Sequence, residues 1–118
     1  MERSWEIERL KAEFRDCQKL LQALGDETRQ YLILQMLQPS SCHGLRVGAI
    51  MERTNLSRPA VSRHLKILRE AGVIKIRREG TKNYYYFAVD EPAIDQVILL
   101  LQHVKQITAS LPQQAEEA

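Results

Sequence analysis

The 118-residue sequence lacks the features that mark several large classes of protein. Its two cysteines are too few for the disulfide framework that stabilises small secreted domains. No apolar run is long enough to span a membrane, and the N-terminus, Met-Glu-Arg-Ser-Trp-Glu, lacks the apolar segment of a signal peptide. We therefore expect a cytoplasmic protein without a membrane partner, organised as a single domain over residues 1–118.

Side chains that could carry out catalysis are few and scattered. The three histidines, His43, His64 and His103, lie far apart in the sequence, and no nucleophile is paired with a base in a known pattern. The five glycines form no phosphate-binding loop. The sequence therefore predicts that the protein is not an enzyme and has no cofactor.

Net charge is also small, at +2, but it is unevenly distributed. The first 56 residues carry equal numbers of acidic and basic side chains. Residues 57–82 carry eight Lys or Arg against two Glu, whereas residues 90–118 carry five acidic side chains against one Lys. A localised basic segment in a nearly neutral chain is typical of a surface that binds a polyanion.

The basic segment begins with the pattern of a short amphipathic helix at residues 57–72. Ser57 is a suitable N-cap, Pro59 is tolerated in the first turn, and Gly72 suits a left-handed C-cap. Apolar residues at helical spacing form one stripe that should face a core, namely Val61, Leu65 and Leu68. Basic and hydroxyl side chains point away from this stripe and suit phosphates and base edges. We interpret the segment as a recognition helix that lies in a DNA groove.

The residues on either side complete a larger unit. Apolar spacing predicts a helix at 46–54, so residues 46–72 have the helix-turn-helix pattern. Residues 73–89 have the pattern of two strands around a turn-rich tip at Arg78–Asn83, which is a β-hairpin wing. A hairpin of helices with a merely solvated basic face, or a winged-helix module that binds protein, would share the helical pattern. The basic wing directly after a basic helix favours DNA.

Long helices are predicted at both ends of the chain, at residues 1–24 and 92–111. Asp26 is expected to cap a further helix, which Pro39 ends. Both terminal helices have apolar residues at alternating spacings of three and four, as in a coiled-coil seam. Either both helices pack within the chain onto its core, or they form the interface of a two-fold homodimer, which we favour. The predicted interface residues are Ile7, Leu10, Phe14, Cys17, Leu21, Val97, Leu101, Val104, Thr108 and Leu111.

Three segments also resemble ArsR/SmtB-type transcriptional regulators. They are Leu24–Leu34, with Gly-Asp-Glu-Thr-Arg at its start, Leu56–Ile74, which contains the recognition helix, and Arg78-Glu79-Gly80 followed by Tyr86. The resemblance implies a mainly α fold with a small β-hairpin wing, in the order α-α-α-α-β-β-α, which dimerises through its terminal helices. It further implies a repressor that binds a near-palindromic double-stranded DNA operator.

The residues expected to contact DNA lie on the recognition helix and the wing. Those that match DNA-contacting positions of the resembling family are Ser57, Arg58, Ala60, Ser62, Arg63 and His64. Lys66 on the helix is expected to touch phosphate or solvent, and Arg77, Arg78 and Lys82 on the wing are expected to approach phosphates or a minor groove.

Many regulators of this type resemble metal-gated switches, but the ligand positions differ here. The positions of the family's Cys-x-Cys pair carry Arg46 and Gly48, and the C-terminal ligand patterns around Asp95 and His103 are incomplete. We therefore predict no metal site. A metal- or thiol-responsive regulator that uses Cys17 and Cys42 is retained as an alternative.

Overall fold

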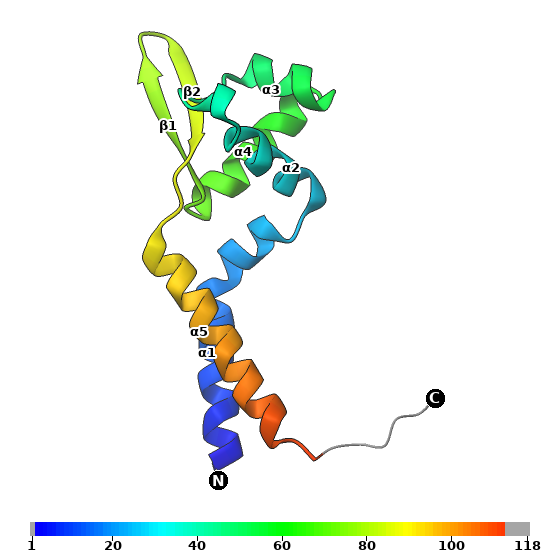
Figure 1. Ribbon diagram of the computed structural model, residues 1–118, viewed down its shortest axis with the longest axis vertical. Coiled ribbons are helices and arrows are strands. Elements are labelled where there is room, and N and C mark those ends of the chain that lie inside the picture. The colour runs from blue at the N-terminus through cyan, green and yellow to red at the C-terminus, as the bar shows by residue number, and fades with distance from the viewer. Residues whose placement is uncertain (1, 113–118) are drawn as a thin grey trace, which may run out of the picture.

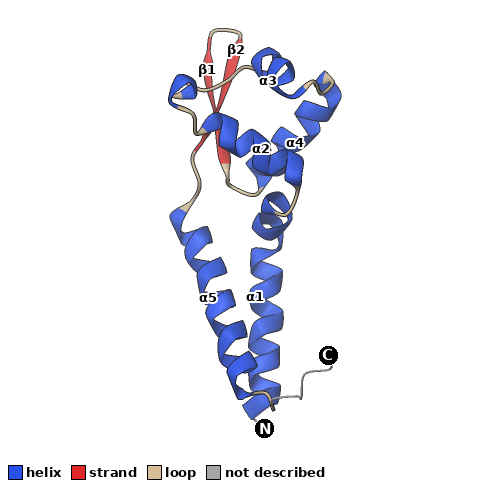
Figure 2. Cartoon of the chain, turned by 45° about the vertical axis from the view of Figure 1, so that its right-hand side comes forward, coloured by secondary structure: helices blue, strands red, loops and turns tan. Residues whose placement is uncertain are grey.

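The structure is a computed structural model that describes residues 2–112. It consists of a winged head, which we define as residues 26–90, and a stalk of two long helices (Figures 1 and 2). The described elements follow the order α1 (Glu2–Leu24), α2 (Glu27–Met36), the 3-10 turn η1 (Pro39–Ser41), α3 (Val47–Thr54), α4 (Arg58–Glu70), β1 (Ile74–Glu79), β2 (Lys82–Phe87) and α5 (Glu91–Ser110). The predicted mainly helical winged helix-turn-helix fold is confirmed.

The core of the head lies where α2, α3 and α4 meet. Leu32 of α2, Ile50 of α3 and Leu65 of α4 are each 1% exposed and belong to one apolar cluster. Val61 and Leu68 are fully buried beside them, so the stripe predicted for the recognition helix does face the core. Burial of a side chain of this kind contributes roughly 1.5–3 kcal/mol to folding, and this packing holds α4 at a defined position.

Both predicted ends of α4 are confirmed by their hydrogen bonds. The Ser57 side chain accepts from the backbone N–H of Ala60 at 3.3 Å, as an N-cap does. At the other end Gly72 has a φ of +77°, and the backbone N–H of Val73 donates to the carbonyl of Leu68 at 3.0 Å. This left-handed glycine reverses the chain at the helix end and leads it directly into β1.

The wing is a two-stranded antiparallel sheet with a shorter tip than predicted. Arg78 pairs with Asn83 and Glu79 with Lys82, so the strands continue through most of the segment expected to be loop. Only two residues, Gly80 and Thr81, connect the strands. The turn can be this tight because Gly80 adopts a φ of +61°, which residues with a side chain disfavour.

The stalk consists of α1 and α5, which run antiparallel and side by side (Figures 1 and 2). Cys17 and Leu100 are buried, whereas Leu20 near the end of α1 is buried in the apolar cluster of the head. His103 Nδ1 of α5 lies 2.6 Å from Glu13 Oε2 of α1, and an Arg3 guanidinium nitrogen donates to Ser110 Oγ at 2.7 Å. The two terminal helices therefore pack against each other within one chain, and the dimer interface stays a prediction.

That packing uses only one edge of the apolar stripes. The predicted interface residue Cys17 is 3% exposed and is already covered within the chain, because the side of α1 that includes Leu20 is the buried one. The partly buried members of the predicted seam are Leu10, Leu21, Val97 and Val104. Those left exposed are Ile7, Phe14, Leu101, Thr108 and Leu111. The exposed members are the part of the predicted dimer interface that remains open in a single chain.

Candidate nucleic-acid interface

The outer face of α4 presents cations to solvent. Arg58, Arg63, Lys66 and Arg69 are exposed, and Ser62 lies exposed among them. Within residues 2–112, none of these four cations has an acidic group within 4 Å, whereas other arginines of the chain do. Since the opposite face of α4 is buried in the core, the helix can offer these side chains only outwards.

Two of the predicted contact residues at the start of α4 have less freedom. The Ser57 hydroxyl is exposed, but it already accepts the capping hydrogen bond from Ala60. Ala60 itself is half-buried, which leaves a small apolar surface that suits a thymine methyl group.

The cations of the wing differ in how far they are already engaged. Arg77 Nε donates to Glu79 Oε2 at 2.9 Å, and the Arg77 guanidinium lies 4.9 Å from the centre of the Tyr84 ring. Arg78 Nε donates across the hairpin to Asn83 Oδ1 at 3.0 Å. Lys82 has no ion pair among the described residues and is exposed. Of the three predicted wing cations, Lys82 is therefore the one whose side chain is not engaged in a contact within the described part of the chain.

An open groove joins the recognition helix to the wing. It has a volume of about 690 Å³, and its lining includes Arg58 at the start of α4, Arg46 before α3, and Thr81 and Asn83 of the wing. Residues from the helix-turn-helix and the hairpin thus border one surface. From the sequence, Arg46 was interpreted only as a residue that replaces a metal-binding cysteine of related regulators. Its positive charge beside the helix-turn-helix was the signal that could have placed it at this groove.

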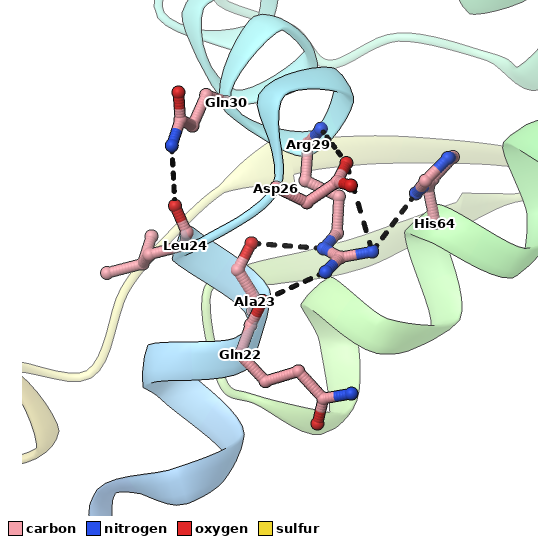
Figure 3. Close-up of polar contacts among 7 residues, drawn as sticks. All are labelled: Gln22, Ala23, Leu24, Asp26, Arg29, Gln30 and His64. Carbon is pink, nitrogen blue, oxygen red and sulfur yellow. Dashed lines mark hydrogen bonds and ion pairs between the residues drawn. The ribbon is translucent and has the colours of Figure 1, made fainter.

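Arg29 of α2 lies in the family-like segment Leu24–Leu34, but the sequence alone indicated no role for its side chain. It is only 8% exposed and contacts α1, α4 and the N-cap residue of its own helix (Figure 3). Its Nε donates to the carbonyl of Ala23 at 3.0 Å, and one terminal nitrogen donates to the carbonyl of Gln22 at 2.9 Å. The other terminal nitrogen lies 3.3 Å from His64 Nδ1 on α4 and 4.0 Å from Asp26 Oδ2.

The surroundings of His64 and Asp26 shift their proton affinities. Burial lowers the pKa of His64 below its ordinary value of 6.5; the Asp26 carboxylate opposes this, whereas the charges of Arg29 and Arg63 add to it. Asp26 is the N-cap of α2, as predicted, and the hydrogen bond from the Arg29 backbone N–H lowers its carboxyl pKa below 3.8. The two shifts therefore favour an uncharged imidazole and a charged carboxylate.

The alternatives based on metal or thiol chemistry gain little from the geometry. Burial raises the pKa of the Cys17 thiol, and the nearby Asp16 and Glu13 carboxylates raise it further, which disfavours the reactive thiolate. Cys42 is exposed in the segment after η1. Across residues 2–112 no three His, Cys, Asp or Glu side chains gather as metal ligands would, and none of the described helices is long and apolar enough to cross a membrane.

Comparisons with known proteins point to regulators. A family model described as "Bacterial regulatory protein, arsR family" matches residues 26–75. An uncharacterised HTH-type transcriptional regulator of Methanocaldococcus jannaschii is 34% identical over 86 residues, which cover 73% of this chain and 91% of that protein. The transcriptional repressor SdpR of Bacillus subtilis is 38% identical over 66 residues, which cover 56% of this chain and 69% of that protein.

Solved structures share the fold. One is the solution structure of a homodimeric winged helix-turn-helix DNA-binding domain from Mycobacterium bovis, described as a possible ArsR-family transcriptional regulator. It superposes with a TM-score of 0.59 at 24% identity and covers 93% of this chain and 94% of that one. At this identity the match supports the architecture, and the outward cations of α4 remain the feature of this chain that bears on what it binds.

Proposed function

Since the chain belongs to the arsR family of bacterial regulatory proteins, we propose that this transcriptional regulator is a homodimeric repressor that occupies a near-palindromic DNA operator. The observation that carries the proposal is the asymmetry of α4, whose apolar stripe is buried while its cations face outwards without acidic partners among the described residues. A helix held in this way can enter a major groove of B-DNA.

In this proposal the contact residues have different roles. Arg58 and Arg63 read base edges, since a guanidinium can bind guanine through two hydrogen bonds, and Ser62 lies between them. Ser57, Ala60 and His64 brace the start and side of the helix against the DNA. The side chains proposed to approach phosphates are Lys66, Arg69, Arg77, Arg78 and Lys82. Lys82 is less engaged than Arg77 and Arg78, which already donate to Glu79 and Asn83.

The proposed dimer is formed by a second copy of the chain on the stalk. Ile7 and Phe14 of α1 are each 50% exposed, and Ile98 and Leu101 of α5 are 47% and 53% exposed. Apolar side chains in this number on two paired helices favour burial against another protein surface. A two-fold axis through the stalk would allow the recognition helices to meet major grooves about 34–36 Å apart. The M. bovis neighbour is described as homodimeric, which supports self-association as part of the proposal.

DNA binding is tested by selecting bound duplexes from a random pool and titrating the enriched site against a shuffled duplex of the same length. We expect a palindromic consensus, one dimer per site, and affinity that falls steeply with salt because phosphate contacts release counterions. A protein that enriches no sequence, or binds DNA without salt dependence, would contradict the proposal and favour a protein-binding winged helix.

Repression is tested separately by transcription in vitro from a promoter that overlaps the selected site. Adding the protein should lower transcript yield, and a promoter with one half-site scrambled should escape. An increase in transcript would show that the regulator activates, while leaving DNA binding intact.

A further inference from the structure

The contact between Arg29 and His64 links α2 to α4 through two residues that are 35 positions apart in the sequence. Arg29 lies at the start of α2, and His64 lies on α4 beside the proposed DNA-contact residue Arg63 (Figure 3). The other nitrogens of the Arg29 guanidinium donate to the Gln22 and Ala23 carbonyls in the last turn of α1. The last carbonyls of a helix lack the usual backbone partner. Arg29 supplies a donor to the Ala23 carbonyl and a second donor to the Gln22 carbonyl, which also accepts from the Gly25 backbone N–H at 3.3 Å. The guanidinium is thereby held in one orientation.

The chemistry of this contact determines where the imidazole carries its proton. A guanidinium has only donors, so His64 Nδ1 can take part at 3.3 Å only as an acceptor. A neutral imidazole whose Nδ1 accepts must carry its hydrogen on Nε2. Burial also disfavours the charged ring. In Figure 3 the other ring nitrogen of His64 points away from Arg29, which makes it a donor available to an outside acceptor.

We propose that Arg29 is a positioning residue for operator binding, which holds His64 in the Nε2–H form so that this ring donates a hydrogen bond to a DNA phosphate oxygen. The inference rests on the proposed function and adds to it. Arg29 also fixes the position of α4 relative to the end of α1, because one guanidinium contacts both helices.

The first test uses the unmodified protein without DNA. Long-range ¹H–¹⁵N correlation spectra of ¹⁵N-labelled protein at neutral pH report which imidazole nitrogen carries hydrogen. We expect the His64 signals to show an unprotonated Nδ1 and a protonated Nε2. A ring protonated on Nδ1, or on both nitrogens, would overturn the proposal. This readout needs no substitution and does not depend on DNA binding.

The second test is a double-mutant cycle on operator affinity with Arg29→Lys, His64→Ala and the combined variant. A lysine keeps the charge but replaces the planar fork, whose three nitrogens each face a different acceptor, by a single ammonium nitrogen. We expect Arg29→Lys to weaken operator binding about tenfold, the size of one well-placed hydrogen bond to a charged group. In the His64→Ala background the same change should have little effect, because Arg29 would have no ring to position.

Arg53→Lys is the matched control. Arg53 is a half-buried arginine of the head that donates to the neighbouring side chains Gln35 and Ser41, and no contact joins it to His64 among the described residues. Its effect on affinity should be the same with and without His64. Circular dichroism and thermal unfolding verify that each variant is folded.

The outcomes separate the two proposals. If the losses from Arg29→Lys and His64→Ala are simply additive, the positioning role is wrong while operator binding stands. If the unmodified protein ignores every selected duplex, the proposed function itself is wrong. If Arg29→Lys does not fold, the tautomer of the unmodified protein still decides whether Arg29 holds the ring as proposed.

Discussion

The winged head and the stalk treat their apolar residues in opposite ways. The head places leucines, isoleucines and valines from α2, α3, α4 and β1 in one buried cluster and turns cations outwards. The stalk buries few side chains, and most of the exposed large apolar residues lie on its two helices or at the cap of α5, namely Trp5, Ile7, Phe14, Leu24, Ile98, Leu99, Leu101 and Leu111. The core of the head is therefore buried within a single chain, whereas the two helices of the stalk leave large apolar side chains exposed to solvent.

The largest effect is expected from a cavity in the head. Leu65→Ala removes a side chain that is 1% exposed and should lower the free energy of unfolding by about 2–5 kcal/mol. Leu34→Ala on α2 is the control, because Leu34 is 56% exposed, and its effect should stay within about 0.5 kcal/mol. Urea unfolding monitored by circular dichroism measures both. Equal effects would mean that the core of the head is not where the structure places it.

A charge on the open side of the stalk tests the other half of the comparison. Leu101→Lys should weaken self-association by about 1.5–3 kcal/mol, because the side chain would no longer be buried against a second copy. Gln106→Lys adds the same charge to α5 at an exposed polar position and should leave association unchanged. Sedimentation equilibrium measures the dissociation constant. If both variants associate as the unmodified chain does, the exposed residues of the stalk are not the dimer interface.

On the head, Arg63 and Arg77 are both cationic but differ in their internal contacts. Arg63→Ala should cost about 1–3 kcal/mol of operator binding if the guanidinium contacts a base edge through two hydrogen bonds. Arg77→Ala should reduce operator binding less, since Arg77 would have to break its hydrogen bond to Glu79 before it could contact DNA. Titrations with the selected and shuffled duplexes distinguish the roles. A loss for Arg63→Ala that is equal on both duplexes would assign Arg63 to phosphate contact.

The smallest effect is a dependence of stability on pH at the boundary between head and stalk. The pKa of His64 in the folded chain lies below its ordinary value of 6.5, so the unfolded chain takes up the proton first as pH falls. Stability is therefore complete above the ordinary value and decreases as pH drops through it towards the lower folded pKa. Urea unfolding on either side of this window should show the decrease in the unmodified protein and a smaller one in His64→Gln. An identical decrease in both would assign it to other groups.

Local sequence signals predicted the head well. Ser57 and Gly72 bracket α4 because each satisfies a helix end with its own chemistry, and the stripe of Leu65 and its neighbours follows from helical geometry alone. The length of the wing tip was overestimated, because turn-forming residues at Arg78–Asn83 are compatible with both a loop and paired strands. Only Gly80, with its positive φ, marks where the chain reverses.

The amino-acid sequence by itself determined the order of helices and strands, the identity of the outward cations on α4 and the family to which the chain belongs, because periodicity, caps and motifs are properties of neighbouring residues. Tertiary structure alone decided which edge of each stalk helix is buried, which wing cations are already engaged, and that Arg29 of α2 meets His64 of α4. These depend on how elements far apart in the chain pack, and a wide apolar stripe or a lone arginine is compatible with several partners until that packing selects one.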